Sequence, residues 1–119
     1  MIMEWLSGMQ AEFIIRLIAA ALCGGALGIE RERRQKSAGI RTHVVVAIAS
    51  ALMMIISKYG FFDVLSHGSI SLDPSRVVSG VVSAIGFLGA GIIFVRHSSA
   101  IGLTTATGIW ATVAIGIAM

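Results

Sequence analysis

An uncharged apolar run over residues 77–95 sets the strongest constraint on the fold of this chain. Its length matches the roughly 20 residues that a helix needs to cross the hydrocarbon core of a bilayer. The 119 residues are 56% hydrophobic and 13% charged, whereas an average soluble domain carries about 25% charged residues. Because small soluble domains bury the smallest fraction of their surface, this composition indicates an integral, all-α membrane protein.

Three further apolar runs extend this prediction to a bundle of about four transmembrane helices. We expect one transmembrane domain over residues 1–119, with no soluble C-terminal domain and with helices near residues 13–29, 43–59, 76–96 and 100–119.

Arg16 lies inside the first run, four residues after Glu12, which predicts an ion pair on one helix face with the arginine reaching outward. A functional role for Arg16 inside the bundle is the alternative. Asp73 and Pro74 predict a helix start, as N-cap and first helical residue.

The last run poses a problem of length. If its helix begins at Ala100, Trp110 falls about 15 Å along the axis, near the middle of the bilayer, whereas tryptophan favours the interfaces. If Thr104 or Thr105 caps the helix, about 22 Å remain before Met119. Either Trp110 packs inside the bundle or the chain ends before its last elements are complete, and we favour the second interpretation.

The segment from Glu30 to His43 concentrates positive charge between two apolar runs. The count of lysines and arginines places this segment and the 96–100 link on the cytoplasmic side, with the N-terminus outside. The net charge of +3 then reflects topology and contact with lipid headgroups, not nucleic-acid binding. We expect the arginines to be topology anchors, and a binding role for Glu30 or Arg41 stays open. The basic residues of the segment are Arg31, Arg33, Arg34, Lys36 and Arg41.

Small residues recur at helical spacing in three of the runs. Membrane helices associate through close backbone approach, which glycine permits, so the pattern predicts a tight bundle and a homodimer. Gly86–Gly91 is not a phosphate-binding loop, because it lies within an uncharged spanning run instead of between a strand and a helix. Thr104, Gly108, Thr112 and Gly116 share one face of the last run. The glycines expected to mediate packing or oligomerisation are Gly24, Gly28, Gly80, Gly86, Gly89 and Gly108.

No catalytic, cofactor or metal site is predicted. The three histidines, His43, His67 and His97, are expected to be loop residues solvated by headgroups. An outward-facing divalent-ion site from Asp63, His67 and Asp73 is conceivable, but neither zinc spacing nor clustered carboxylates support it. The apolar runs contain no acidic residue that would mark a cation pathway, and the sequence gives no support for an enzyme.

Three blocks of sequence together resemble the MgtC/SapB family of bacterial inner-membrane proteins. The first runs from Arg16 to His43 and contains Glu30, Gly39, Arg41 and Thr42. The second runs from Asp73 to Phe94, and the third is GLTTATGIW, residues 102–110. Ile101 departs from the family pattern, in which a basic residue often precedes the third block.

The resemblance implies a multi-span helical domain, followed in many members by a soluble domain. It also implies a non-enzymatic interaction or regulatory role linked to magnesium limitation and virulence, through restraint of a membrane complex such as the F-type ATP synthase. By position in the third block, Thr104 and its neighbour Thr105 are the expected contacts with a partner complex. Divalent-cation (Mg²⁺) transport or sensing is the alternative function.

Overall fold

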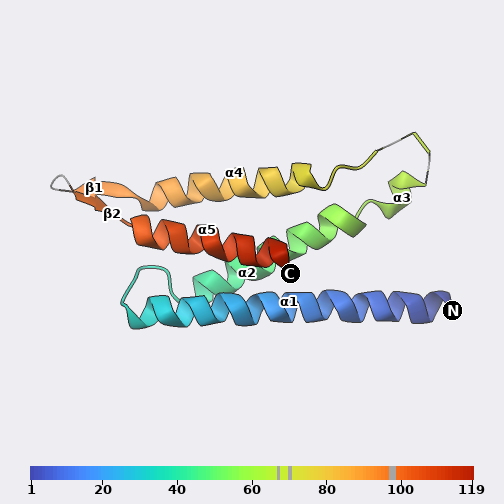
Figure 1. Cartoon of the computed structure of the whole chain (residues 1–119), viewed down its shortest axis with the longest axis horizontal. Coiled ribbons are helices and arrows are strands. Elements are labelled where there is room, and N and C mark those ends of the chain that lie inside the picture. Colours follow the sequence, from blue (N-terminus) through green and yellow to red (C-terminus); the bar gives the residue numbers. More distant parts are fainter. Residues whose placement is uncertain (67, 70, 97–98) are drawn as a thin grey trace.

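The computed structural model describes residues 1–66, 68–69, 71–96 and 99–119. Four long helices dominate it: α1 (Ile2–Arg33), α2 (Ile40–Tyr59), α4 (Ser75–Ile92) and α5 (Leu103–Ala118). A four-residue helix, α3 (Phe62–Leu65), follows α2, and two short strands, β1 (Phe94–Arg96) and β2 (Ser99–Ile101), form a hairpin between α4 and α5 (Figure 1). The predicted α-helical class is confirmed.

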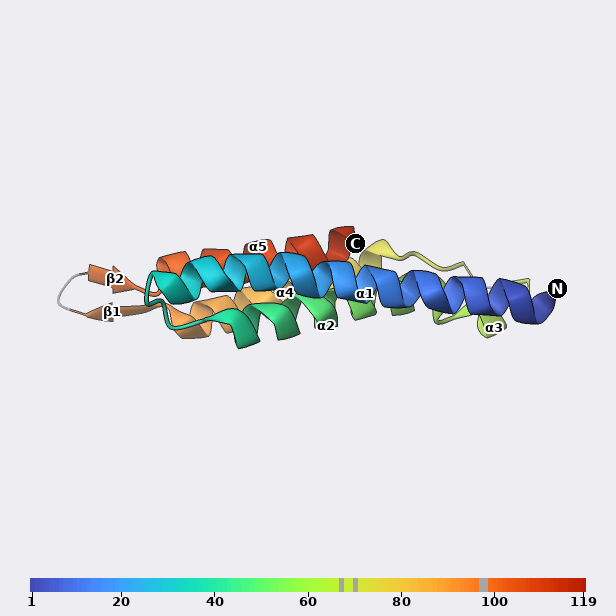
Figure 2. The same ribbon diagram turned by 90° about the horizontal axis from the view of Figure 1, so that it is seen from below.

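The helices form a long, flat assembly. The Cα atoms extend over 61 × 30 × 14 Å, and the edge-on view of Figure 2 shows how thin the molecule is. In Figure 1, α5 lies between α4 on one side and α1 with α2 on the other. The basic loop between α1 and α2 and the β1–β2 hairpin lie at one end, whereas the N-terminus and α3 lie at the other. The two links predicted to share one side of the membrane therefore share one end of the molecule.

The interior is built mainly from small and polar residues, with Ile55, Ile109 and Val113 also buried, and many large apolar side chains point outward. Ala20, Ala47 and Ala51 form the apolar contact between α1 and α2. By contrast, Leu22 is 69% exposed and Phe87 is 86% exposed. This distribution is expected where lipid solvates the outer surface and close backbone approach holds the helices together. Buried polar residues include His43, Ser50, Ser57, Thr105 and Thr112.

In the described part of the chain, three helical segments are long and apolar enough to cross a membrane. They are residues Ser7–Arg33, Ile40–Leu65 and Ser75–Ile92. The fourth, α5, has 16 residues, or about 24 Å at 1.5 Å per residue, which is shorter than the hydrocarbon core. Trp110 on α5 is 52% exposed, so the interpretation that it packs inside this chain is wrong.

The end of the third apolar run differs from the prediction. The expected helix to residue 96 stops at Ile92, and Ile93 is already extended, with ψ of 128°. The chain then forms the hairpin, in which Phe94 pairs with Ile101 and Arg96 with Ser99. Hydropathy alone overextends this helix, because β-branched and aromatic residues such as those at 92–95 also favour strands. Gly102 adopts φ of +89° and ends the hairpin against α5.

The helix α4 begins at Ser75 with Pro74 as its N-cap, so the prediction of Asp73 as N-cap and Pro74 as first helical residue is one residue too early, although the Asp73 side chain still contacts the helix start. The Oδ1 atom of Asp73 accepts hydrogen bonds from the backbone N–H of Ser75, at 3.0 Å, and from its hydroxyl, at 2.6 Å. These two hydrogen bonds, with the nearby charge of Arg76, hold the pKa of Asp73 below its ordinary value despite some desolvation. The carboxylate is therefore engaged at the helix start.

Acidification is expected to loosen the first turn of α4. Because the pKa of Asp73 is lowered in the folded state, its stabilising effect is complete above the unfolded value, about 3.9. It is then lost as the pH falls through the lower, folded value. The protection of the Ser75 amide, measured by NMR relative to the intrinsic exchange rate at each pH, should fall below about pH 4. Asp73→Asn keeps an acceptor without the charge, so an unchanged pH profile in that variant would contradict the assignment.

The predicted ion pair in α1 is confirmed. The Nε atom of Arg16 donates to Oε1 of Glu12 at 3.0 Å, and its Nη1 donates to the backbone carbonyl of Met119 at 2.8 Å. At the same end of the α1–α2 contact, the rings of Phe13 and Tyr59 lie 5.0 Å apart. Arg16 thus ties α1 to the last residue of the chain.

Candidate functional site

The last turn of α1 carries a three-residue charge cluster. The Glu30 carboxylate accepts from Nε of Arg31 at 2.8 Å through Oε2 and pairs through Oε1 with Nε of Arg34. The Arg31 side chain is only 15% exposed, whereas Arg34 is 70% exposed. One carboxylate therefore serves two guanidinium groups, and the cluster keeps an excess positive charge.

A tight loop returns the chain from α1 to α2. Gln35 adopts a left-handed backbone conformation, with φ of 55°, and Lys36 N–H donates to the carbonyl of Arg31 at 3.1 Å. The carboxylate of Glu32 then accepts from the backbone N–H of Ile40 at 3.1 Å, which satisfies an amide at the start of α2. At Gly28, a Cβ atom would lie 2.6 Å from Cα of Ile40. Glycine is thus required for the loop to close so near α1.

His43 lies in the first turn of α2 and is completely buried. Its Nδ1 is 2.9 Å from the carbonyl oxygen of Gly39. A carbonyl only accepts hydrogen bonds, so Nδ1 carries a hydrogen. Among the described residues, Nε2 is buried without a hydrogen-bond partner. The prediction that His43 is solvated by headgroups is therefore wrong.

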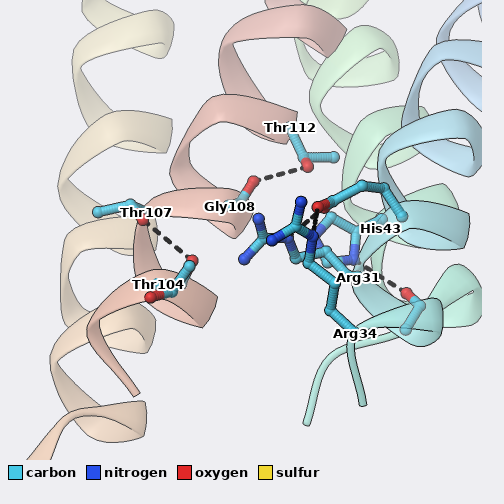
Figure 3. Close-up of polar contacts among 9 residues, drawn as sticks. Arg31, Arg34, His43, Thr104, Thr107, Gly108 and Thr112 are labelled. Carbon is cyan, nitrogen blue, oxygen red and sulfur yellow. Dashed lines mark hydrogen bonds and ion pairs between the residues drawn. The ribbon is translucent and has the colours of Figure 1, made fainter. Parts of the chain in front are cut away.

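Arg31 presents a second buried polar atom at the same place. Its Nη1 is buried and has no hydrogen-bond partner in the described part of the chain. Opposite both residues lies Gly108 of α5, where a Cβ atom would be 3.5 Å from Nε2 of His43 and 3.7 Å from Cδ of Arg31. Figure 3 shows these side chains converging on α5. The Arg31 side chain is thus turned into the protein, and the expected role of the loop arginines as topology anchors stays a prediction.

The face of α5 beside Arg31 and His43 carries hydroxyl groups. Thr112 is completely buried and donates to the carbonyl of Gly108 at 2.8 Å. One turn before Gly108, Thr105 is 4% exposed, and its hydroxyl accepts from that of Ser37 at 3.4 Å. A pocket of about 240 Å³ opens next to this pair, between the α1–α2 loop and the start of α5. Its lining includes Lys36, Ser37, Thr104 and Thr105.

The predicted packing glycines fall into two groups. Gly24 and Gly28 lie against α2, and a Cβ atom at Gly24 would be 2.6 Å from that of Ala47. Gly89 faces Ala106 of α5. Around Gly80 and Gly86, however, no described atom beyond the local helix backbone lies within 4 Å of the Cβ position. Gly24, Gly28 and Gly89 therefore pack against other helices of this chain, whereas Gly80 and Gly86 on α4 are not covered by one.

The other residues singled out by sequence are distributed around this site. Thr104 is exposed, with its neighbour Thr107 donating to its carbonyl at 3.0 Å. Thr105, in contrast, is buried within the chain. Gly39 accepts the hydrogen bond of His43, and Arg33, Arg41 and Thr42 are exposed. His67 and His97 lie outside the described residues, so the conceivable divalent-ion site at His67 stays a prediction.

Sequence reasoning did not predict that Arg31 and His43 both lie against Gly108. The one indication in the sequence was that Thr105, Gly108 and Thr112 recur along one face of α5. On that face, two hydroxyl-bearing residues flank a residue without a side chain. Nothing in the spacing of Arg31 and His43 indicates which helix covers them. That information comes from the tertiary contact with a helix more than 60 residues later.

The fold and the site define a small α-helical membrane protein with a polar, close-packed interior. A family model described as the MgtC family matches residues 17–119. The chain belongs to this family, and it is a membrane protein.

Relatives with known names agree with this membership. The chain is 59% identical over 109 residues to "Putative magnesium transporter YhiD" of Escherichia coli K12, covering 92% of this chain and 51% of the relative. It is 32% identical over 119 residues to "Protein SapB" of Bacillus subtilis, covering 99% and 50%. It is 42% identical over 101 residues to "Protein MgtC" of Brucella abortus strain 2308, covering 85% and 39%. The chain thus spans about half the length of these relatives or less, and no solved structure matches it.

Proposed function

We propose that this chain acts as a non-enzymatic interaction module of the bacterial inner membrane. Its regulatory role is linked to magnesium limitation and virulence, through restraint of a membrane complex such as the F-type ATP synthase. Membership of the MgtC family and the names of the relatives support a membrane protein with a connection to magnesium. In this proposal the basic segment 30–43 is cytoplasmic, and it shares an end with the β1–β2 hairpin (Figure 1).

The observation that carries this proposal is the set of glycines on α4 that no other part of the chain covers. Of the described residues of α4, Gly89 alone is buried. Beyond the local helix backbone, no described atom lies within 4 Å of the Cβ positions of Gly80, Gly86 and Gly91. Helical geometry puts Gly80 and Gly91 on one face, whereas Gly86 lines an open pocket beside α5. Elsewhere in this chain, glycines such as Gly24 allow a neighbouring helix to approach closely. Uncovered glycines favour packing against a second copy or against a helix of a partner complex.

The exposed end of α5 offers a second contact. Thr104 is exposed beside the pocket at the α1–α2 loop, whereas Thr105 is buried against Ser37. In this proposal Thr104 touches the partner complex directly. Thr105 acts on that contact only by holding the loop in place.

Leucine at Gly80 or Gly86 should reduce assembly without unfolding the protomer. The first added atom has room at either site, because no described atom beyond the local helix backbone lies within 4 Å of the Cβ position, but the side chain blocks backbone approach by another helix. Self-association can be measured by energy transfer between labelled copies in vesicles, and partner binding by co-purification. Leu88→Ala, at an exposed site on α4, is the control. Parent-like assembly of both glycine variants would contradict the proposal.

Transport or sensing of Mg²⁺ is the second candidate function. The name of the 59% identical relative from Escherichia coli favours it. Purified protein in vesicles that contain a magnesium-sensitive dye should then pass Mg²⁺ faster than empty vesicles do. Against this candidate, the polar site between α1, α2 and α5 is lined by Arg31 and His43, and its carboxylate already pairs with two arginines. Transport at the rate of empty vesicles, together with no binding of Mg²⁺ to the purified protein, would remove this candidate.

A further inference from the structure

The pocket at the basic end of the molecule has a lining suited to an anion. It lies between the α1–α2 loop and the start of α5, and its volume is about 240 Å³. A single water molecule needs only roughly 10–15 Å³ of such space, so the pocket has room for a polyatomic group. Its lining combines one positive charge with amide and hydroxyl groups and contains no carboxylate. The polar lining residues are Gln35, Lys36, Ser37, Thr104 and Thr105.

Lys36 carries the positive charge of the pocket. No carboxylate in the described part of the chain pairs with its ammonium group. The nearest acidic residues along the chain are already engaged, because Glu30 pairs with two arginines of α1 and Glu32 accepts from the backbone N–H of Ile40. The helix α5 on the other side of the pocket has no charged residue. The pocket therefore keeps an uncompensated positive charge.

A buried hydroxyl in the pocket has a hydrogen without an acceptor. Ser37 donates to the hydroxyl oxygen of Thr105 at 3.4 Å, and each of these hydroxyls carries one hydrogen of its own. Thr105 is only 4% exposed and lines the pocket, and its own hydrogen has no acceptor among the described residues. Because a buried donor without an acceptor is destabilising, this hydroxyl points to an acceptor inside the pocket.

The start of α5 adds backbone donors to the same pocket. The helix begins at Leu103, and no side chain caps it. The N–H groups of a first helical turn have no acceptor within the helix, and they favour a negative charge placed against them. Gly102 and Thr104 line the pocket, so these N–H groups lie beside it. Together with Lys36 and Thr105, they provide donors from both sides of the pocket.

Exposed apolar side chains border this polar pocket. Ile101 lines it and is 40% exposed, and the nearby Leu103 is 50% exposed. The pocket lies at the end of the molecule that carries the basic loop (Figure 1). When the helices cross a bilayer, this end falls at the level of the lipid headgroups. An anion with an attached hydrocarbon part contacts both the polar and the apolar surface, whereas a free ion contacts only the polar one.

We propose that this pocket binds a phosphate group, and that its apolar border favours the headgroup of an anionic phospholipid as the source of that phosphate. Lys36 pairs with the negative charge, and Thr105 donates its unused hydrogen to a phosphate oxygen. The bound headgroup then connects the α1–α2 loop to the start of α5. The pocket is separate from the uncovered glycines of α4, so this proposal does not rest on the assembly proposed above, and either can fail alone.

Binding can be tested on the full chain in nanodiscs. Discs of phosphatidylcholine are compared with discs that contain increasing fractions of phosphatidylglycerol, and the backbone NMR signals of Ser37, Gly102 and Thr105 are followed. We expect these signals to shift and to saturate, while the signal of Gly60 at the other end of α2 stays in place. Equal shifts at both ends, or no saturable shift with either phosphatidylglycerol or inorganic phosphate, would overturn the proposal.

Lys36→Gln is the decisive variant, and Arg33→Gln is its matched control. Both remove one positive charge from the basic segment, but Arg33 is exposed and does not line the pocket. We expect Lys36→Gln to weaken binding about fivefold, as for the loss of one lysine beside an anionic headgroup, and Arg33→Gln to weaken it clearly less. Equal weakening in the two variants would indicate diffuse attraction to the basic segment and would refute the pocket.

Thr105 provides a test that does not change the charge. Thr105→Val keeps the shape of the side chain but removes the hydroxyl, so it should weaken binding, whereas Thr105→Ser should restore it. Circular dichroism should show the same helix content in both variants. Parent-like binding by Thr105→Val would overturn the placement of the phosphate in this pocket.

Inorganic phosphate distinguishes the two sources of the phosphate group. It is titrated into discs of phosphatidylcholine alone, and the same NMR signals are followed. If phosphatidylglycerol shifts these signals and inorganic phosphate does not, the lipid is the ligand. If inorganic phosphate saturates the same signals by itself, the phosphate site is supported and the assignment to a lipid is overturned.

Discussion

Replacing Gly116 with alanine is expected to destabilise the packing of α5 on α2 by about 2 kcal/mol or more. The added Cβ would overlap the backbone carbonyl of Ala47 and lie 2.7 Å from Cβ of Ser50. These are backbone and first side-chain atoms, so no flexible group can move aside. The intrinsic preference of helices for alanine over glycine, at most about 1 kcal/mol, does not offset this overlap. Reversible unfolding in mixed micelles, followed by circular dichroism, measures the effect.

Gly80→Ala is the control for this substitution. It changes the same residue type inside a membrane helix, at a position with no described atom within 4 Å of the new Cβ. It should stabilise the protomer by about 0.5–1 kcal/mol, because alanine loses less backbone entropy on folding. Equal stabilities of the Gly116 and Gly80 variants would mean that α5 does not approach α2 as closely as the structure has it.

Substituting Glu30 with glutamine is expected to lower the free energy of unfolding by about 1–3 kcal/mol. The Arg31 guanidinium is largely buried, and Glu30 is its charged partner. Removing one member of a buried pair leaves an uncompensated charge, although Glu30 is itself 41% exposed, which reduces the cost through solvent screening. The same unfolding measurement applies.

Arg34→Gln distinguishes a buried pair from a surface pair on the same carboxylate. Arg34 is 70% exposed, and exposed ion pairs contribute about 0–1 kcal/mol. We therefore expect the free energy of unfolding of this variant to be close to that of the parent and clearly higher than that of Glu30→Gln. If Arg34→Gln is as unstable as Glu30→Gln, the burial of Arg31 does not control the energetics of the cluster.

The membrane class and the four long helices could be predicted from hydropathy, because the apolar runs are long and bounded by charge. The pairing of Arg16 with Glu12 followed from their spacing alone. The β1–β2 hairpin could not be predicted in this way, since Phe94 and Val95 continue the apolar run without a break. Hydropathy reports the solvent that a residue prefers, and it does not distinguish a helix end from a short strand.

The candidate site was beyond sequence reasoning for a different reason. His43 has no local feature that separates a buried from a lipid-facing position, and its burial depends on the glycine that α5 places opposite it. The same holds for Arg31. Arg33, Arg34 and Arg41 lie in the same basic segment, yet they are exposed. The family motif marked the correct stretch of chain, but only the contact between distant helices separates these arginines.

The length of α1 exceeds that of α4 only in its polar parts. The candidate span on α1 covers 27 residues and that on α4 covers 18, but the stretch of α1 between Glu12 and Glu30 has 17 residues. The two apolar lengths are then about 26 Å and 27 Å along the helix axes. Both are shorter than a hydrocarbon core of about 30 Å, so the lipid thins beside them or their flanking charged side chains extend to the interface, at a cost of a fraction of a kcal/mol per Å of mismatch. A thinner membrane should therefore hold this protein with less deformation of the surrounding lipid than a thicker one.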